Sequence, residues 1–168
     1  MKNLILFALL ITTVIGCGFG LTSESGTLPY PKGKEKIKDT LTTITYSDKV
    51  WKEKLGDASF QILRNKGTER AATGIYNKHN KKGNYCCKGC GLPLFESDTK
   101  FDSGTGWPSY YNFINNHVEH KEDGGYGMVR TEVVCKRCKG HLGHVFDDGP
   151  KPTGLRYCIN SLSLEFED

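Results

Sequence analysis

The apolar and polar positions divide this 168-residue chain into an apolar start, a polar stretch and a patterned remainder. Residues 4–15 are uncharged and follow Lys2, and they are too few to cross a bilayer, which takes about 20 residues. This pattern predicts a secretory signal peptide over residues 1–17. Residues 18–45 are rich in Gly, Ser, Thr, Lys and Pro without apolar periodicity, which predicts a flexible tether. Residues 46–168 are predicted to form one domain.

Two helices are predicted at the start of this domain. Ser47 has the chemistry of an N-cap, and Val50, Trp51 and Leu55 have the spacing of one helical face. Asp57 begins a second predicted helix, and Gly67 marks its end.

The pattern then changes to that of strands and turns. Residues 74–76 and 85–86 flank the polar stretch 77–83, which predicts a hairpin. A second turn is predicted at residues 123–125, after which Val129, Thr131 and Val133 alternate with polar positions. These signals indicate a small, mainly β domain with two helices in front of it.

A final strand is predicted to begin near Leu155, after the loop at residues 147–150. Alternation places six residues on one face, namely Arg156, Cys158, Asn160, Leu162, Leu164 and Phe166. A lone cysteine on such a face is usually a small apolar residue. Arg156, however, favours a thiolate, and burial of arginine and asparagine is unfavourable without a function. The near half of this face is therefore a candidate site.

Four cysteines form two pairs, Cys87-x-x-Cys90 and Cys135-x-x-Cys138, separated by 44 residues. Two such hooks suit a tetrahedral zinc ion, with about 2.3 Å from metal to sulfur. Two disulfides are the alternative, which export would favour. The spacing favours one structural zinc per chain. Four protein ligands leave no open position for a substrate, and no organic cofactor is expected.

Two further segments carry candidate chemistry. His141 and His144 each follow a glycine directly after the second hook, and histidine exchanges protons near neutral pH. Surface exposure is the alternative for both. Trp107 lies on a turn bordered by glycines and proline, where it is either a core residue or the wall of a substrate pocket.

The formal net charge is +4, and the lysines of the tether supply much of it. Basic residues are not interleaved with aromatic ones, so no nucleic-acid groove is predicted. Residues 14–17, Val-Ile-Gly-Cys, resemble the lipobox of bacterial lipoproteins, in which the cysteine is acylated. With Cys17 acylated, a bacterial chain would be a periplasmic or cell-surface lipoprotein that touches the membrane only through its lipid anchor. A chain from a source that is not bacterial would be secreted.

Four separated segments, in this order, resemble methionine sulfoxide reductase type B. They are LRNKGTERAATG, SGTGWPSYY, CKRCKGHLGHVFDDGP and PTGLRYCINSLSLEF, and the likeness extends over about residues 47–168. The resemblance implies two antiparallel sheets arranged as a tent, with helices at the N-terminal side. It also implies that the substrate is the R-epimer of methionine sulfoxide, preferentially in proteins, and that a thioredoxin-like or other thiol reductant is a partner. A monomer is expected.

The same resemblance assigns roles to residues of the candidate site. Cys158 corresponds to the nucleophile, which attacks the sulfoxide sulfur and becomes a sulfenic acid. His141, His144 and Asn160 would hold and protonate the oxygen. Arg156 would stabilise the thiolate.

Trp107 corresponds to the aromatic residue that packs on the substrate's S-methyl group, and Phe146 is a second candidate for substrate binding. Thr105 stands where many relatives have a second, resolving cysteine. Cys86 is then a substitute resolver, an alternate zinc ligand or an inert buried cysteine. Residues 70–72, Arg-Ala-Ala, also depart from the proline and phenylalanine that are common in relatives.

Two other functions compete with the enzyme. One is a non-catalytic, zinc-stapled binding module, for which Cys158 would be dispensable. The other is a zinc ribbon that binds nucleic acid. Export and the acidic residues Glu119, Glu122 and Asp123 disfavour the zinc ribbon.

Overall fold

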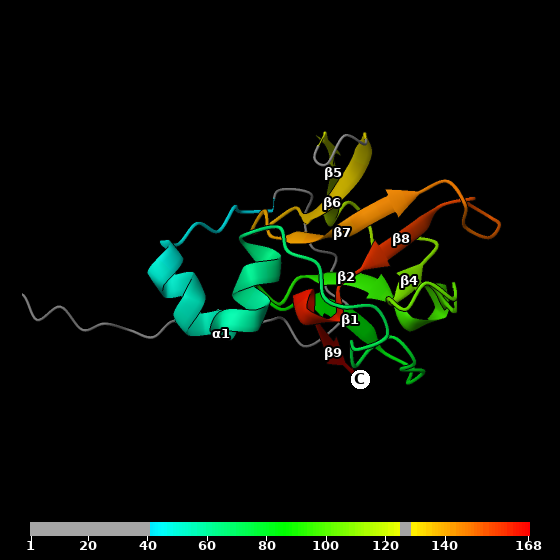
Figure 1. The fold of residues 1–168 in the computed structure, drawn as a ribbon, viewed down its shortest axis with the longest axis horizontal. Helices are drawn as coiled ribbons and strands as arrows, with labels where there is room; N and C mark the ends of the chain where they lie inside the picture. The colour runs from blue at the N-terminus through cyan, green and yellow to red at the C-terminus, as the bar shows by residue number, and fades with distance from the viewer. Residues whose placement is uncertain (1–40, 125–128) are drawn as a thin grey trace, which may run out of the picture.

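A computed structural model describes residues 41–124 and 129–168 (Figure 1). The predicted signal peptide, Cys17 and most of the predicted tether lie outside these residues. The three-stranded sheet has the order β2-β1-β9 and consists of β1 (Asn84–Cys87), β2 (Pro93–Glu96) and β9 (Leu164–Glu167). The six-stranded sheet has the order β3-β4-β8-β7-β6-β5 and consists of β3 (Lys100–Phe101), β4 (Ser109–Tyr110), β5 (Val118–Asp123), β6 (Arg130–Cys135), β7 (His141–Phe146) and β8 (Arg156–Ile159).

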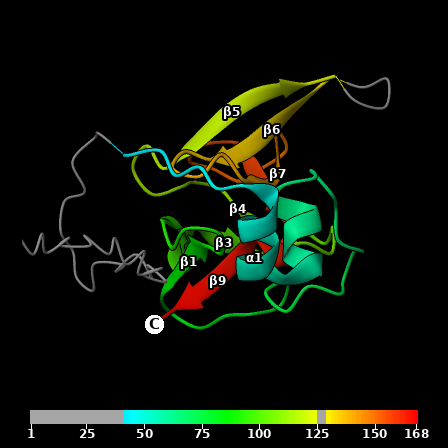
Figure 2. The same cartoon turned by 90° about the vertical axis from the view of Figure 1, so that its left-hand side faces the viewer.

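All strand pairs in both sheets are antiparallel, so the predicted mainly β class with two antiparallel sheets is confirmed. The β5–β6 hairpin lies on the far side of the molecule from β9, as Figure 2 shows. Two short 3-10 helices complete the described chain, η1 (Ser97–Thr99) and η3 (Ser161–Ser163). No helix among the described residues is both long and apolar enough to span a membrane.

The predicted pair of helices forms one helical segment, α1 (Asp48–Leu63), with a kink. Gly56 breaks the helical path with φ 70°, a conformation that glycine adopts without steric strain. Trp51 and Leu55 face the core, as their spacing predicted, but the prediction is wrong for Val50, which is exposed. The segment ends at Leu63, before Gly67.

The predicted hairpin of residues 74–76 with 85–86 is wrong. Residues 75–78 form a turn, and β1 pairs with β2 and β9 instead. The Tyr76 N–H donates to the Ser161 hydroxyl (3.2 Å), and the Tyr76 hydroxyl accepts from the Phe166 N–H (3.1 Å). Side-chain hydroxyls therefore form the hydrogen bonds to the backbone N–H groups of Tyr76 and Phe166 that a neighbouring strand would otherwise form.

The alternation predicted after the second turn is also wrong in detail. Val129 precedes β6 and is 80% exposed, and Thr131 is exposed. Glu132 is the buried residue, at 1% exposure. A register shift between Val133 and Val134 then buries both valines, because an irregularity in the ladder interrupts the two-residue period.

The predicted single strand near the C-terminus is two strands in different sheets. β8 pairs with β4 and β7, and β9 pairs with β1, with η3 between them. The Asn160 carbonyl accepts both the N–H (3.1 Å) and the hydroxyl (2.7 Å) of Ser163, which turns the chain. Tyr157 and Ile159 of β8 face the core, so Cys158 lies on the opposite face.

The end of the predicted tether belongs to the folded part. Leu41 and Ile44 are partly buried against the core, and the Ile44 N–H donates to the Arg137 carbonyl (2.9 Å).

Candidate active site

The four paired cysteines lie together. The sulfurs of Cys87, Cys90, Cys135 and Cys138 are all within 4.8 Å of one another. Two of the sulfur–sulfur distances are 3.5 Å, between Cys87 and Cys138 and between Cys90 and Cys135. A tetrahedron with about 2.3 Å from zinc to sulfur has edges of about 3.8 Å, so the donor set fits such an ion. The predicted convergence of the two hooks is confirmed.

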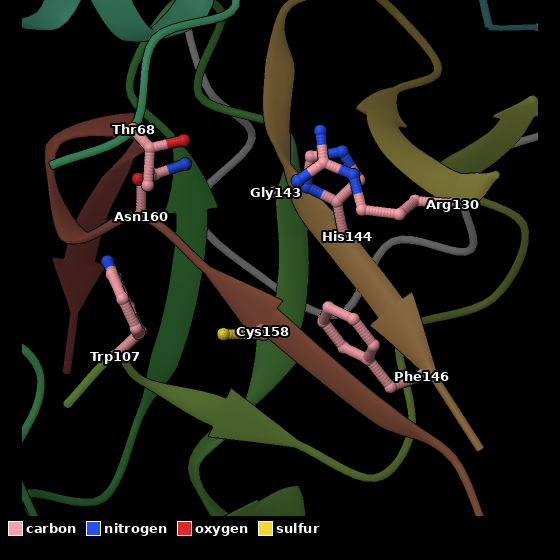
Figure 3. A pocket seen from close by; sticks show the side chains of 8 residues that line it. All are labelled: Thr68, Trp107, Arg130, Gly143, His144, Phe146, Cys158 and Asn160. Carbon is pink, nitrogen blue, oxygen red and sulfur yellow. The ribbon is translucent and has the colours of Figure 1, made fainter. Parts of the chain in front are cut away.

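A separate pocket of about 140 Å³ opens on the six-stranded sheet. Its lining residues come from the strands β6, β7 and β8 and from three segments outside the strands, and they are Thr68, Trp107, Arg130, Gly143, His144, Phe146, Cys158 and Asn160 (Figure 3). In this view the Cys158 sulfur lies between the Trp107 ring on one side and the Phe146 ring on the other. The volume suits the end of one side chain, because sites for larger ligands measure about 300–1,000 Å³.

The ionisation of Cys158 is set by opposing effects. Burial raises the pKa of its thiol, while the Arg156 guanidinium and a hydrogen bond from the Thr105 hydroxyl lower it. The charge of Asp148 raises the pKa further. Arg156 therefore favours the thiolate, as expected from the sequence, but the net direction of the pKa shift is upward. Desolvation of the charged form exceeds the stabilisation by Arg156.

Arg156 is not among the residues that line the pocket, but its side chain is hydrogen-bonded to Cys158. Its guanidinium donates two hydrogen bonds to the Asp148 carboxylate, from Nε and Nη2 at 2.8 Å each. It also stacks over the Phe146 ring at 4.4 Å from the centroid. Asp148 therefore orients Arg156, and Arg156 supports the Phe146 wall.

His144 enters the pocket from β7 with one nitrogen already engaged. Its Nε2 is 2.8 Å from the Asp123 carboxylate, and Arg130 Nη2 donates to the same oxygen at 2.9 Å. A carboxylate oxygen only accepts, so Nε2 carries the hydrogen. A proton that moves between His144 and a bound molecule therefore enters or leaves at Nδ1.

The structure does not place His141 in the pocket lining. Its ring is buried, and Nδ1 lies 2.8 Å from the Glu132 carboxylate, which also accepts from Lys66 Nζ at 2.7 Å. Nε2 is buried without a hydrogen-bond partner among the described residues. Burial lowers the pKa of His141, so the ring is neutral at pH 7 and Nε2 is an acceptor. The predicted role of His141 beside His144 stays a prediction, because its ring lies outside the residues that line the pocket. The two rings touch, with centroids 5.4 Å apart.

Asn160 and Trp107 are fixed by the chain segment that contains Thr68. The Glu69 N–H donates to Asn160 Oδ1 (3.0 Å), and Trp107 Nε1 donates to the Glu69 carbonyl (3.1 Å). Asn160 Nδ2 donates to the Leu142 carbonyl (2.9 Å), so this amide keeps one N–H for a bound molecule. Residues 70–72 pack beside the Trp107 loop, where the Ala72 N–H donates to the Gly106 carbonyl (2.8 Å).

Thr105 and Cys86 have different surroundings. The Thr105 hydroxyl lies 2.8 Å from that of Ser103, which lies 2.7 Å from that of Ser109, the residue opposite Cys158 in the β4–β8 ladder. Cys86 is on β1 of the other sheet at 1% exposure, and burial raises the pKa of its thiol strongly. The structure therefore does not bring Cys86 to the Cys158 pocket.

Several polar residues of the site were not found by sequence reasoning: Thr68, Glu69, Asp123, Arg130, Glu132 and Asp148. Most of them act through a partner distant in sequence, so their spacing carries no signal. Glu132 was missed for another reason, because the predicted alternation places it among the outward polar positions of the strand.

Comparison with known proteins identifies the family. A family model for the SelR domain matches residues 55–168. The chain belongs to this family. A SelR-family relative from Leptospira interrogans, a peptide methionine sulfoxide reductase MsrB, is 54% identical over 74% of this chain and 95% of its own length. Proteins of the same name from Thiobacillus denitrificans and Bradyrhizobium diazoefficiens are 57% and 50% identical, over 71% and 79% of this chain and 92% and 96% of their own lengths.

The SelR match contains every residue that lines the pocket and all four clustered cysteines. The family assignment therefore applies to the part of the chain that carries the site.

Proposed function

We propose that this chain reduces methionine R-sulfoxide to methionine, with Cys158 as the nucleophile. One observation carries the proposal: among the described cysteines, only Cys158 lines the pocket, and it lies there with two aromatic rings, a histidine and an asparagine. Membership of a family whose relatives carry the name peptide methionine sulfoxide reductase supports the same reaction.

The pocket suits a methionine sulfoxide side chain. Trp107 and Phe146 present apolar surfaces on either side of the sulfur, which accommodate the S-methyl group and the side-chain methylenes. His144 and the remaining Asn160 N–H provide polar contacts for the sulfoxide oxygen. The small volume leaves the rest of a peptide outside, so protein-bound methionine sulfoxide is an accessible substrate.

The chemistry begins from a protonated thiol. Cys158 loses its proton, and its sulfur attacks the sulfoxide sulfur. The S–O bond then breaks and the oxygen moves to the Cys158 sulfur, which releases methionine and leaves a sulfenic acid. The thiol proton ends on the sulfenic acid oxygen, so the step needs no other proton. His144, through Nδ1, is positioned to carry that proton from sulfur to oxygen.

An external thiol regenerates Cys158 in this proposal. The first thiol attacks the sulfenic sulfur and releases water to give a mixed disulfide. A second thiol then restores Cys158 and leaves the reductant oxidised. The burial of Cys86 in the other sheet and the presence of Thr105 beside Cys158 favour this route over an internal disulfide. A thioredoxin-like dithiol has the required chemistry.

The metal in this proposal is a structural zinc ion held by Cys87, Cys90, Cys135 and Cys138. Bound there, the ion would tie the loop after β1 to the turn between β6 and β7. Because β7 carries His144 and Phe146, this connection would keep the pocket wall in place.

Export and acylation at Cys17 also belong to the proposal. Their support is the uncharged run at residues 4–15 and the lipobox-like residues 14–17. Intact-mass measurement of protein extracted from membranes tests both. A mature chain that begins at Cys17 and carries acyl chains is the expected result, and a chain that retains residues 1–16 would refute it.

The enzymatic proposal is tested with a peptide containing methionine R-sulfoxide and dithiothreitol, which replaces a protein reductant. Wild type should form methionine, Cys158→Ser should form none, and Cys86→Ser should match wild type. After one turnover without reductant, mass spectrometry should find one added oxygen on the peptide that contains Cys158. An active Cys158→Ser variant would refute Cys158 as the nucleophile, and an inactive wild type would favour the non-catalytic binding module.

A further inference from the structure

Glu69 is a buried acidic residue next to the pocket, and the reaction proposed above does not use it. It is 7% exposed and directly follows Thr68, which lines the pocket. Its carboxylate accepts the N–H of Ser161 (2.7 Å) and the N–H of Leu162 (3.0 Å). Among the residues that the structure describes, no lysine or arginine lies within ion-pair distance of this carboxylate.

A buried carboxylate without a cation is unfavourable unless hydrogen bonds replace its hydration. Here the two N–H groups that do so belong to the turn directly after Asn160. The surroundings are also closely packed, because a Cβ at Gly74 would lie 2.5 Å from Glu69 Oε1 and 2.2 Å from Ser161 Oγ. The chain at Gly74 therefore closes over the carboxylate and holds it against the turn.

The backbone of Glu69 contacts both polar atoms that orient the pocket walls. Its N–H donates to Asn160 Oδ1, and its carbonyl accepts from Trp107 Nε1. In Figure 3 the Trp107 nitrogen points toward the segment that contains Thr68, and Asn160 lies beside that segment. One residue thus connects the turn, the amide and the indole through four hydrogen bonds.

We propose that Glu69 is a positioning residue for the reduction, because its carboxylate fixes the segment that orients the Asn160 amide and the Trp107 ring in the pocket. This inference rests on the reductase activity proposed above. Without the carboxylate, the turn at residues 161–162 and the segment at residues 68–69 lose their direct connection. The free Asn160 N–H then no longer has one fixed direction, and misplacement of about 1 Å at such a contact lowers a rate by up to about a hundredfold.

The test compares Glu69→Ala and Glu69→Gln with Val118→Ala, a core variant in β5 whose side chain does not line the pocket. All are assayed with the sulfoxide peptide and dithiothreitol, at a temperature where urea curves show each to be folded. Glu69→Ala should lower kcat/KM about tenfold or more. Glu69→Gln, which keeps one acceptor oxygen, should recover part of this loss. Val118→Ala should keep the wild-type kcat and KM.

A double-mutant cycle with Asn160→Ala separates positioning from general stability. Because Glu69 acts partly through Asn160, Glu69→Ala should lower kcat by a clearly smaller factor in the Asn160→Ala background than in wild type. The inference would be overturned if folded Glu69→Ala had wild-type kinetics. It would also be overturned if the separate effects of Glu69→Ala and Asn160→Ala on kcat multiplied in full in the double variant. If Glu69→Ala does not fold, the same cycle with Glu69→Gln decides. An inactive wild type would instead overturn the proposed function itself.

Discussion

Replacement of Gly143 by alanine should force β7 and β8 apart at the pocket. Gly143 lies opposite Ile159 in this ladder and lines the pocket beside Cys158. A Cβ built at Gly143 would lie 2.0 Å from the Cys158 carbonyl oxygen and 3.0 Å from Ile159 Cα. The obstacles are backbone atoms, so a change of side-chain rotamer cannot relieve the clash.

The size of the effect follows from this geometry. Relief of the contact requires a movement of more than about 1 Å between two strands that are otherwise close-packed. Overpacking costs about 1–3 kcal/mol. Two weakened ladder hydrogen bonds cost about 0.5–1.5 kcal/mol each. The free energy of unfolding should therefore fall by about 2–6 kcal/mol, a large part of the roughly 5–15 kcal/mol typical of a domain.

Urea unfolding measures this loss, and Gly124→Ala is the matched control. A Cβ at Gly124 would have no atom within 4 Å, so the control should stay within about 0.5 kcal/mol of wild type. The rate at which Gly143→Ala reduces the sulfoxide peptide should also fall, because the movement of the strands displaces Cys158. The reasoning is refuted if the two variants unfold at the same urea concentration and reduce the sulfoxide peptide equally fast.

Three further predictions concern the metal, the thiol and pH. Removal of metal with a chelator should lower the urea midpoint and slow the reductase, although the pocket residues are unchanged. Added zinc should restore both the midpoint and the rate. Unchanged unfolding curves would show that the four-cysteine cluster needs no metal. Arg156→Met should shift the pH midpoint of Cys158 alkylation upward, because the guanidinium lowers the pKa of this thiol. Peptide mass spectrometry measures the alkylation rate at this cysteine alone. Burial lowers the pKa of His141 below 6.5 in the folded protein. As the pH falls, this side chain therefore binds a proton in the unfolded chain at a higher pH than in the folded one. Stability should therefore decrease from about pH 6.5 downward. Urea curves at pH 7.5 and 5.5 should show a smaller decrease for His141→Gln, and an equal decrease would contradict the assignment.

The sequence predicted those parts of the molecule that depend on local pattern. The spacing of Cys87 with Cys90 and of Cys135 with Cys138 was sufficient to predict their convergence, because each hook brings two sulfurs close together. The helical spacing of Trp51 and Leu55 predicted the buried face of α1. The polar residues around Cys158 predicted a site on that face of β8, and Cys158, Asn160, His144, Phe146 and Trp107 line one pocket.

Other features depend on contacts between distant segments, which pattern does not record. The chain after Asn160 continues the apolar alternation, yet the bonds from Ser163 to the Asn160 carbonyl turn it into another sheet. The Glu132 carboxylate contacts both Lys66 and His141, which lie far apart in the sequence. These partners come together only when the sheets have formed.

The chemical identity of the site was therefore determined by the sequence, because residue types and short spacings fix which groups are available. The protonation of those groups was decided by the tertiary structure. Arg156, two residues away, favours a thiolate at Cys158, whereas the surrounding strands remove water from the sulfur and raise its pKa. Desolvation depends on every segment packed around a group, so it becomes known only when the chain is folded.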